Sequence, residues 1–188
     1  MPAYAVKPGG ALEGLTSVTQ LDHYADALGN KFYDADPGYI TTEQNARRLA
    51  GYGITRLEHV VSSEAAELAQ LGNAYRRKEP IVLYLYHPHA AFAQYDMVQL
   101  DEPTPYTDGC LTRGDGACAM PSYSANIAAS KDLQEQAPEF VDLLRDLRIS
   151  IEEMEQMQKQ VDIDGQDLEV VSRQWIDEHA GHIDAWIG

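Results

Sequence analysis

Ile81-Val82-Leu83-Tyr84-Leu85-Tyr86 is the strongest strand candidate of this 188-residue chain, and it decides the fold class. The run is apolar throughout, which is typical of a parallel strand covered on both faces, whereas a strand with one wet face alternates. Pro88 ends the strand, because proline has no N–H to give to a sheet. The run therefore predicts the interior of a layered α/β sheet.

Strands and helices alternate on either side of this run. Thr41 and Gln44 have the spacing of a capping box, which would start a helix just after a turn. The alternation predicts an α/β ligand-binding lobe with a mostly parallel sheet over residues 1–130, followed by C-terminal helices over residues 131–188. The predicted strands cover residues 3–6, 31–34, 57–61, 81–86, 97–100 and 123–128, and the predicted helices cover residues 16–29, a segment from 41, 65–78, 138–147, 150–161 and 167–179.

Two loops that follow predicted strands carry Tyr39 and Tyr86. Ligands of α/β sheets bind outside the carboxyl ends of the strands, so both tyrosines are site candidates. A tyrosine face attracts a cation by roughly 0.5 to 2 kcal/mol, which suits an ammonium group that has no N–H to donate. The backbone N–H groups of Ile40 and Thr41, at a helix N-terminus, would hold a carboxylate. The residues by themselves leave two alternatives open: a small quaternary-ammonium ligand, or tyrosines that only pack in the core, which is the more common case.

The formal net charge of −16 argues against nucleic acid as a partner, because phosphate is held by lysine and arginine. No apolar run approaches the ~20 residues that span a bilayer. The opening Met1-Pro2-Ala3-Tyr4 lacks the basic and apolar regions of a signal peptide. Composition therefore indicates a soluble, folded chain. The acidic charge usually serves solubility alone, and it permits a cationic or zwitterionic ligand.

Cys110 and Cys118 lie close together in a stretch rich in turn-forming residues, which makes them candidates for a local disulfide. In an oxidising compartment the bridge would pin a loop, and in a reducing one the two would remain thiols. The sequence leaves both alternatives open.

Other chemistries find little support in the motifs. His87-Pro88-His89 suggests a metal, with the cysteines as further ligands, but neither CxxC nor HExxH spacing occurs. Ser62 and Ser63 lack the setting of a catalytic serine, and there is no phosphate-binding glycine loop. We therefore expect no enzyme activity, no metal and no cofactor.

A series of segments along the chain matches one known family in order and spacing. They are Asp36-Pro37-Gly38, Ser62-Ser63-Glu64-Ala65-Ala66, residues 75–82, His87-Pro88-His89, residues 92–96 and the ending from Trp175 to Ile187. Together they resemble the substrate-binding proteins of ABC importers for glycine betaine, proline betaine and choline. The likeness implies a small quaternary-ammonium ligand and a type II periplasmic-binding-protein-like fold, in which two α/β lobes close on the ligand. It also implies an ABC permease as partner and a periplasmic or extracytoplasmic location.

The resemblance also bears on single positions. Tyr39 falls where the family has an aromatic residue after the proline-glycine turn, and Tyr86 where it commonly has tryptophan. His87 and His89 fall in the ligand-binding stretch, and Ala90 stands where the family often has tryptophan.

By the same resemblance, the chain covers only the second lobe and the C-terminal helices. We expect those helices to need another cover, such as a second copy of the chain. The alternative function is therefore an assembly protein that keeps the fold and forms a homodimer without a role in transport.

Overall fold

The computed structural model describes residues 3–6 and 10–181. They fall into two compact units, of which unit 1 spans Met1–His87 and Gln94–Pro121. Unit 2 spans Pro88–Ala93 and Ser122–Gly188. Part of the sequence opening and of the ending singled out above, residues 1–2 and 182–187, lies outside the described residues.

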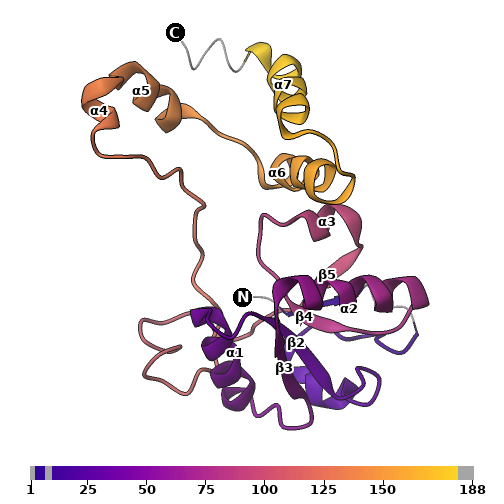
Figure 1. Cartoon of the computed structure of the whole chain (residues 1–188). Coiled ribbons are helices and arrows are strands. Elements are labelled where there is room, and N and C mark those ends of the chain that lie inside the picture. The colour runs from indigo at the N-terminus through magenta and orange to yellow at the C-terminus, as the bar shows by residue number, and fades with distance from the viewer. Residues whose placement is uncertain (1–2, 7–9, 182–188) are drawn as a thin grey trace. The chain divides into compact units, whose positions relative to one another are not determined.

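Unit 1 contains a five-stranded sheet with the order β3-β2-β4-β1-β5 (Figure 1). Strand β2 pairs in parallel with β3 on one side and with β4 on the other. Strand β1 pairs antiparallel with both β4 and β5. The predicted fold class is confirmed, with β1 as the antiparallel member of a sheet whose other strands share one direction. The strands are β1 (Ala3–Val6), β2 (Lys31–Ala35), β3 (Glu58–Ser62), β4 (Val82–Tyr84) and β5 (Met97–Gln99).

The core of unit 1 joins β2 and β4 to the segment that precedes β2. Strand β4 is buried at every residue, as its apolar run predicts. It is shorter than the predicted strand, because pairing ends at Tyr84 and the next two residues lead into a loop. The core cluster consists of Leu12, Leu15, Val18, Leu21, Ala25, Leu28, Phe32, Ile54, Leu57, Val82, Tyr84 and Leu100.

Three helices complete unit 1: η1 (Val18–Tyr24), α1 (Ile40–Gly51) and α2 (Glu64–Arg77). The predicted helix over residues 16–29 is wrong in type and length, because η1 is a short 3-10 helix that gives way to turns after Tyr24. The predicted capping box of Thr41 and Gln44 is also wrong. Helix α1 already begins at Ile40, and its N-cap, Tyr39, makes no side-chain cap hydrogen bond.

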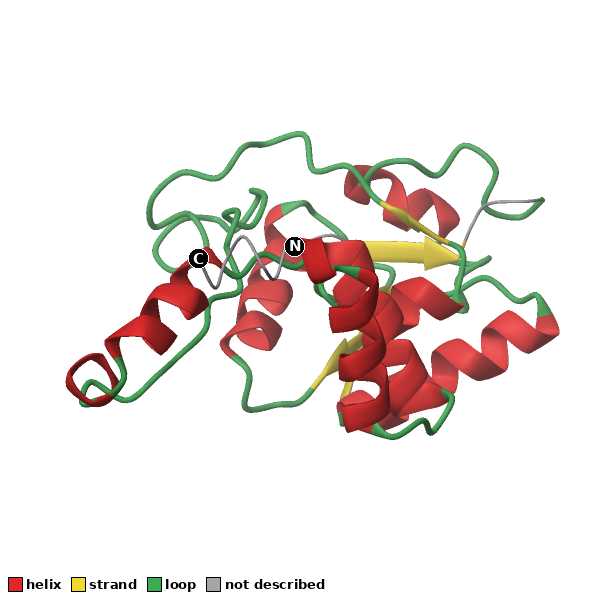
Figure 2. Cartoon of the chain, turned by 90° about the horizontal axis from the view of Figure 1, so that it is seen from above, coloured by secondary structure: helices red, strands yellow, loops and turns green. Residues whose placement is uncertain are grey.

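The regular elements described in unit 2 are all helices; Figure 2 draws the helices of both units in red and the connecting segments in green. Ser150 and Glu153 form a capping box that starts α6 where the sequence predicts a helix. Within the described residues, no helix has both the length and the apolar composition that crossing a bilayer requires. The elements of unit 2 are most of α3 (Ala90–Gln94), then α4 (Leu133–Gln136), α5 (Pro138–Asp146), α6 (Ile151–Gln158), the π-helical η2 (Lys159–Ile163) and α7 (Leu168–Glu178).

The strand predicted over residues 123–128 is wrong. These residues have no regular structure, and each of them is exposed. A strand gains most of its stability from pairing and from burying one face, and this segment does neither.

Candidate cation-binding site

The candidate site lies in unit 1, at the carboxyl ends of the parallel strands β2, β3 and β4. Strand β2 leads through Asp36 to Tyr39 and α1, and β3 leads directly into α2. Strand β4 leads to Tyr86. Because parallel strands share their carboxyl edge, these three loops meet at one side of the sheet.

Tyr39 is presented by the turn between β2 and α1. As the N-cap of α1 it keeps an extended backbone (φ −80°, ψ 135°), and its side chain is 45% exposed. The hydroxyl of Thr42 holds this turn from below by donating to the carbonyl oxygens of Ala35 and Asp36. The following residue, Ile40, is also exposed and is the first residue of the helix. Tyr39 therefore stands beside the backbone N–H groups that open α1.

Tyr86 is held more firmly. Its ring packs against the core cluster and lies 6.2 Å from the ring of Tyr84, centroid to centroid. Its hydroxyl donates a hydrogen bond of 3.1 Å to the carboxylate of Glu64. Burial raises the pKa of Tyr86, and the charge of Glu64 and the nearby Tyr39 add to the rise. Tyr86 is thus fixed by the core on one side and by Glu64 at its hydroxyl.

Two carboxylates accompany the tyrosines. Glu64 opens α2, and its backbone N–H donates to Asp36 Oδ2 at 3.4 Å. Asp36 has a positive φ of 21°, which lets the chain turn sharply out of β2. Negative charge beside aromatic faces favours a cationic group and disfavours an anionic one.

A third carboxyl group, that of Glu67, is completely buried one turn further along α2. Neither of its oxygens makes a hydrogen bond of normal geometry. The backbone of Tyr84 lies near enough to offset a little of the cost of burying a charged carboxylate. Burial raises the pKa of Glu67 to about 9, and the charges of Asp34, Glu64 and Asp36 add to the rise. Glu67 is therefore a neutral acid at pH 7.

The other predicted residues have different settings. Thr41 and His87 are half-buried in unit 1, each next in sequence to a site residue. His89 belongs to unit 2, where its backbone N–H donates to Glu155 at 3.4 Å and its Nδ1 accepts the N–H of Ala91 at 3.0 Å. These bonds make His89 part of the start of α3.

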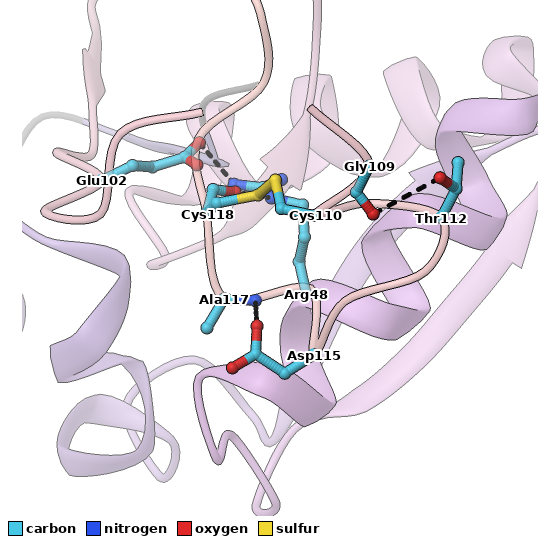
Figure 3. The surroundings of a disulfide bond; sticks show 8 residues. All are labelled: Arg48, Glu102, Gly109, Cys110, Thr112, Asp115, Ala117 and Cys118. Carbon is cyan, nitrogen blue, oxygen red and sulfur yellow. Dashed lines mark hydrogen bonds and ion pairs between the residues drawn. A yellow bond between two sulfur atoms is a disulfide. The ribbon is translucent and has the colours of Figure 1, made fainter. Parts of the chain in front are cut away.

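Cys110 and Cys118 form a disulfide, with their Cα atoms 6.6 Å apart (Figure 3). Among the described residues, no group of three or more histidines, cysteines and acidic residues is placed to hold a metal ion.

Asp36 and Glu64 lie beside the predicted residues, and sequence reasoning missed them. Asp36 directly follows β2 and Glu64 is the first residue of α2, and that place at the carboxyl end of a strand is the signal that could have found them. Glu64 was passed over because an acidic residue early in a helix is usually explained by the helix dipole alone.

Solved structures share this fold. One is a glycine betaine and L-proline transporter binding protein (ProX) from Borrelia burgdorferi, with a TM-score of 0.67 and 20% identity over 100% of this chain and 66% of that one. Another is lactococcal OpuAC in a closed conformation with glycine betaine, with a TM-score of 0.69 and 21% identity over 100% of this chain and 67% of that one. A choline-binding protein in complex with choline has a TM-score of 0.63 and 22% identity over 99% of this chain and 63% of that one.

Sequence comparison agrees with the fold. The glycine betaine/carnitine transport binding protein GbuC of Listeria monocytogenes is 25% identical over 153 residues, which are 81% of this chain and 47% of that protein. The profile of the OpuAC family, described as the substrate binding domain of ABC-type glycine betaine transport systems, matches residues 1–178.

The fold is that of a type II periplasmic-binding-protein-like domain. The family match places it among solute-binding proteins, a class that does not consist of enzymes. Within that class, the chain belongs to the OpuAC family of glycine betaine substrate-binding domains. It spans about half the length of the curated relative and about two thirds of the solved ones.

Proposed function

We propose that this chain binds a small quaternary-ammonium osmolyte of the glycine betaine type, as all or part of the substrate-binding component of an ABC importer. The observation that carries the proposal is the pair Tyr39 and Tyr86 at the carboxyl ends of parallel strands, with Glu64 bonded to one of them. Methylated ammonium offers no N–H, so aromatic faces and carboxylate charge are the groups that attract it.

The two ends of such a ligand meet different parts of the site. The ammonium group lies against Tyr39 and Tyr86, near the charge of Glu64. The carboxylate accepts from the N–H groups of Ile40 and Thr41 at the positive end of α1. No charged side chain is needed for the carboxylate, which explains how a site with several acids accepts a zwitterion. His87, next in sequence to Tyr86, borders the ligand in this proposal.

Calorimetric titration tests the proposal. Glycine betaine, choline and carnitine are titrated into the folded chain, with glycine as the control that lacks the methyl groups. Binding of a methylated ligand without binding of glycine is the expected result. A folded, concentrated sample that gives no heat with any of them contradicts the proposal for this chain.

The proposal includes the partners and location typical of such a component. An ABC permease receives the ligand, and the protein works on the outer side of the cytoplasmic membrane. A pull-down of the permease that depends on the ligand tests the first point. Fractionation of the source cells tests the second.

A second candidate function is assembly through the helices of unit 2. Apolar side chains remain exposed on α5 and α7, namely Phe140, Leu168, Val170 and Ile176. Exposed apolar surface of this kind is common at interfaces between copies of a chain. Light scattering that shows a tight dimer, unchanged by betaine or choline, favours this candidate over solute binding.

A further inference from the structure

Helix α1 is docked onto unit 1 by polar side chains. Its buried residues are Thr42, Asn45 and Arg48, spaced three apart on one face. Most helices dock through an apolar stripe, which tolerates small shifts because hydrophobic contact is not directional. A stripe of hydrogen bonds restricts both the rotation and the axial position of the helix.

The stripe forms a continuous chain of bonds. His59 and Asn45 both meet Asp34 Oδ2, at 2.7 and 2.8 Å, and the other oxygen of Asp34 accepts the N–H of Ala35 at 2.9 Å. Asn45 accepts in turn from Arg48 Nη1 at 3.0 Å. Asp34 and Asn45 are almost completely buried. This series of hydrogen bonds thus connects the end of β2, which leads into the Tyr39 turn, to the middle of α1.

Arg48 extends the chain to the disulfide loop. Its Nε donates to the carbonyl of Cys118 at 3.2 Å, and its Nη2 forms an ion pair with Glu102 in which both side chains are 7% exposed (Figure 3). All three nitrogens of the guanidinium are therefore engaged, each with a different segment of unit 1.

The loop also lies directly against α1. A side chain at Gly51 would collide with the backbone of Asp115 and Ala117, and one at Gly116 would stand 2.7 Å from the carbonyl of Arg47. Contact this close requires glycine on both sides, and the Cys110–Cys118 disulfide closes the loop that makes it.

We infer that Arg48 is a positioning residue for ligand selectivity, and that the disulfide loop is the anchor against which it acts. By holding α1 in one position, Arg48 keeps the N–H groups of Ile40 and Thr41 aimed at a ligand carboxylate. The inference rests on the proposed function, because it concerns the carboxylate end of the same site. It predicts that Arg48 matters for ligands with a carboxylate and not for those without one.

The experiment compares glycine betaine, which has a carboxylate, with choline, which has none. We expect Arg48→Met to weaken betaine binding about tenfold or more, because a helix N-terminus contributes about that much to holding an anion, while choline binding changes by less than about threefold. Arg47→Met makes the same change on an exposed neighbour and should alter neither. A variant that loses both ligands equally, or neither, overturns the inference.

A second variant keeps the inference testable if Arg48→Met fails to fold. The double change Cys110→Ser and Cys118→Ser opens the loop and leaves Arg48 in place, so it should shift selectivity in the same direction. If the unaltered chain binds neither ligand, the proposed function fails, and hydrogen exchange tests separately the structural step of the inference, that Arg48 and the disulfide loop hold α1 in place. Faster exchange over residues 42–48 in Arg48→Met and in the cysteine variant, with α2 unchanged, supports it. Unchanged exchange in α1 overturns it.

Discussion

Tyr86 is the better anchored of the two tyrosines in the proposed site. Its ring packs on the core and its hydroxyl is bonded to Glu64, so the ring has little freedom left to lose if a ligand binds. Tyr39 is the opposite case, since nearly half of it is exposed and it caps α1 without a side-chain bond. Under the proposed function we therefore expect Tyr86 to contribute more than Tyr39 to cation binding.

Changes at Tyr86 should separate the ring from its hydroxyl. Tyr86→Leu keeps an apolar side chain but removes the π face, and it should weaken choline binding by about tenfold, the equivalent of ~1.4 kcal/mol. Tyr86→Phe keeps the face and should stay within about threefold of the unaltered chain. Calorimetry measures both. Equal losses in the two variants would show that the hydroxyl, and not the face, holds the ligand.

Glu67 makes stability depend on pH. Its pKa is about 9 when folded and near the ordinary 4.5 when unfolded, so between these values the folded chain binds the extra proton. The contribution of Glu67 to the free energy of unfolding is therefore fully present below pH 4.5. It is lost as pH rises toward 9, by up to roughly 1 kcal/mol per pH unit.

Glu67→Gln should remove this dependence, because the amide is neutral at every pH. We expect the free energy of unfolding of the variant to increase relative to that of the unaltered chain as pH rises from 5 to 9, as measured by urea unfolding at several pH values. Glu58→Gln, on an exposed side chain, serves as the control. Parallel stability curves for Glu67→Gln and the unaltered chain would contradict a raised pKa.

At the scale of elements, α1 depends on close backbone contact as well as on its polar stripe. The disulfide loop approaches the C-terminal half of the helix so closely that Gly51 and Gly116 have no room for a side chain. The neighbouring helix α2 is built in the common way, with a Ser63 cap and a positive-φ residue, Lys78, at its end. The two helices that border the site therefore respond to different changes.

Gly51→Ala should destabilise unit 1 by about 1 to 3 kcal/mol, because the added methyl meets backbone that cannot rotate away. Gly38→Ala is the matched control, since nothing lies within 4 Å of its added methyl and its effect should stay within about 0.5 kcal/mol. Thermal or urea unfolding provides the measurement. Similar stability of the two variants would mean that the disulfide loop moves aside for the added methyl group at little cost.

At the scale of the whole molecule, the chain passes between unit 1 and unit 2 three times, at residues 87–88, 93–94 and 121–122. The last of these passages leads into residues 122–130, which are exposed and have no regular structure. Such segments are the usual sites of proteolytic cleavage, because a protease must bind several residues in extended form.

Brief digestion with chymotrypsin should therefore cut first after Tyr123, which is 66% exposed. The expected products are fragments 1–123 and 124–188, identified by mass. Tyr123→Thr should delay the cut without changing stability. A first cut next to a buried aromatic such as Phe32 would show that unit 1 opens before the connecting segment is cleaved.

Much of unit 1 could be predicted from the sequence, because the signals concerned are local. The unbroken apolar run of residues 81–86 indicates a buried parallel strand, and β4 lies within it. The strand, turn and helix order around Tyr39 also places that residue at a carboxyl end without any knowledge of pairing. Local reasoning failed for residues 123–128, because a segment of mixed polarity becomes a strand only when another strand pairs with it.

By itself, then, the sequence determined the α/β class, and it led to the predictions that Tyr39 and Tyr86 bind the ligand and that the ligand is a quaternary ammonium. The tertiary structure decided the antiparallel place of β1, the carboxylates beside Tyr86 and the bonds that join Asp34, Asn45 and Arg48 to the disulfide loop. The physical reason is distance along the chain. Propensity and periodicity act over a few residues, whereas Arg48 meets Cys118 across 70 residues, and only the complete fold brings such partners together.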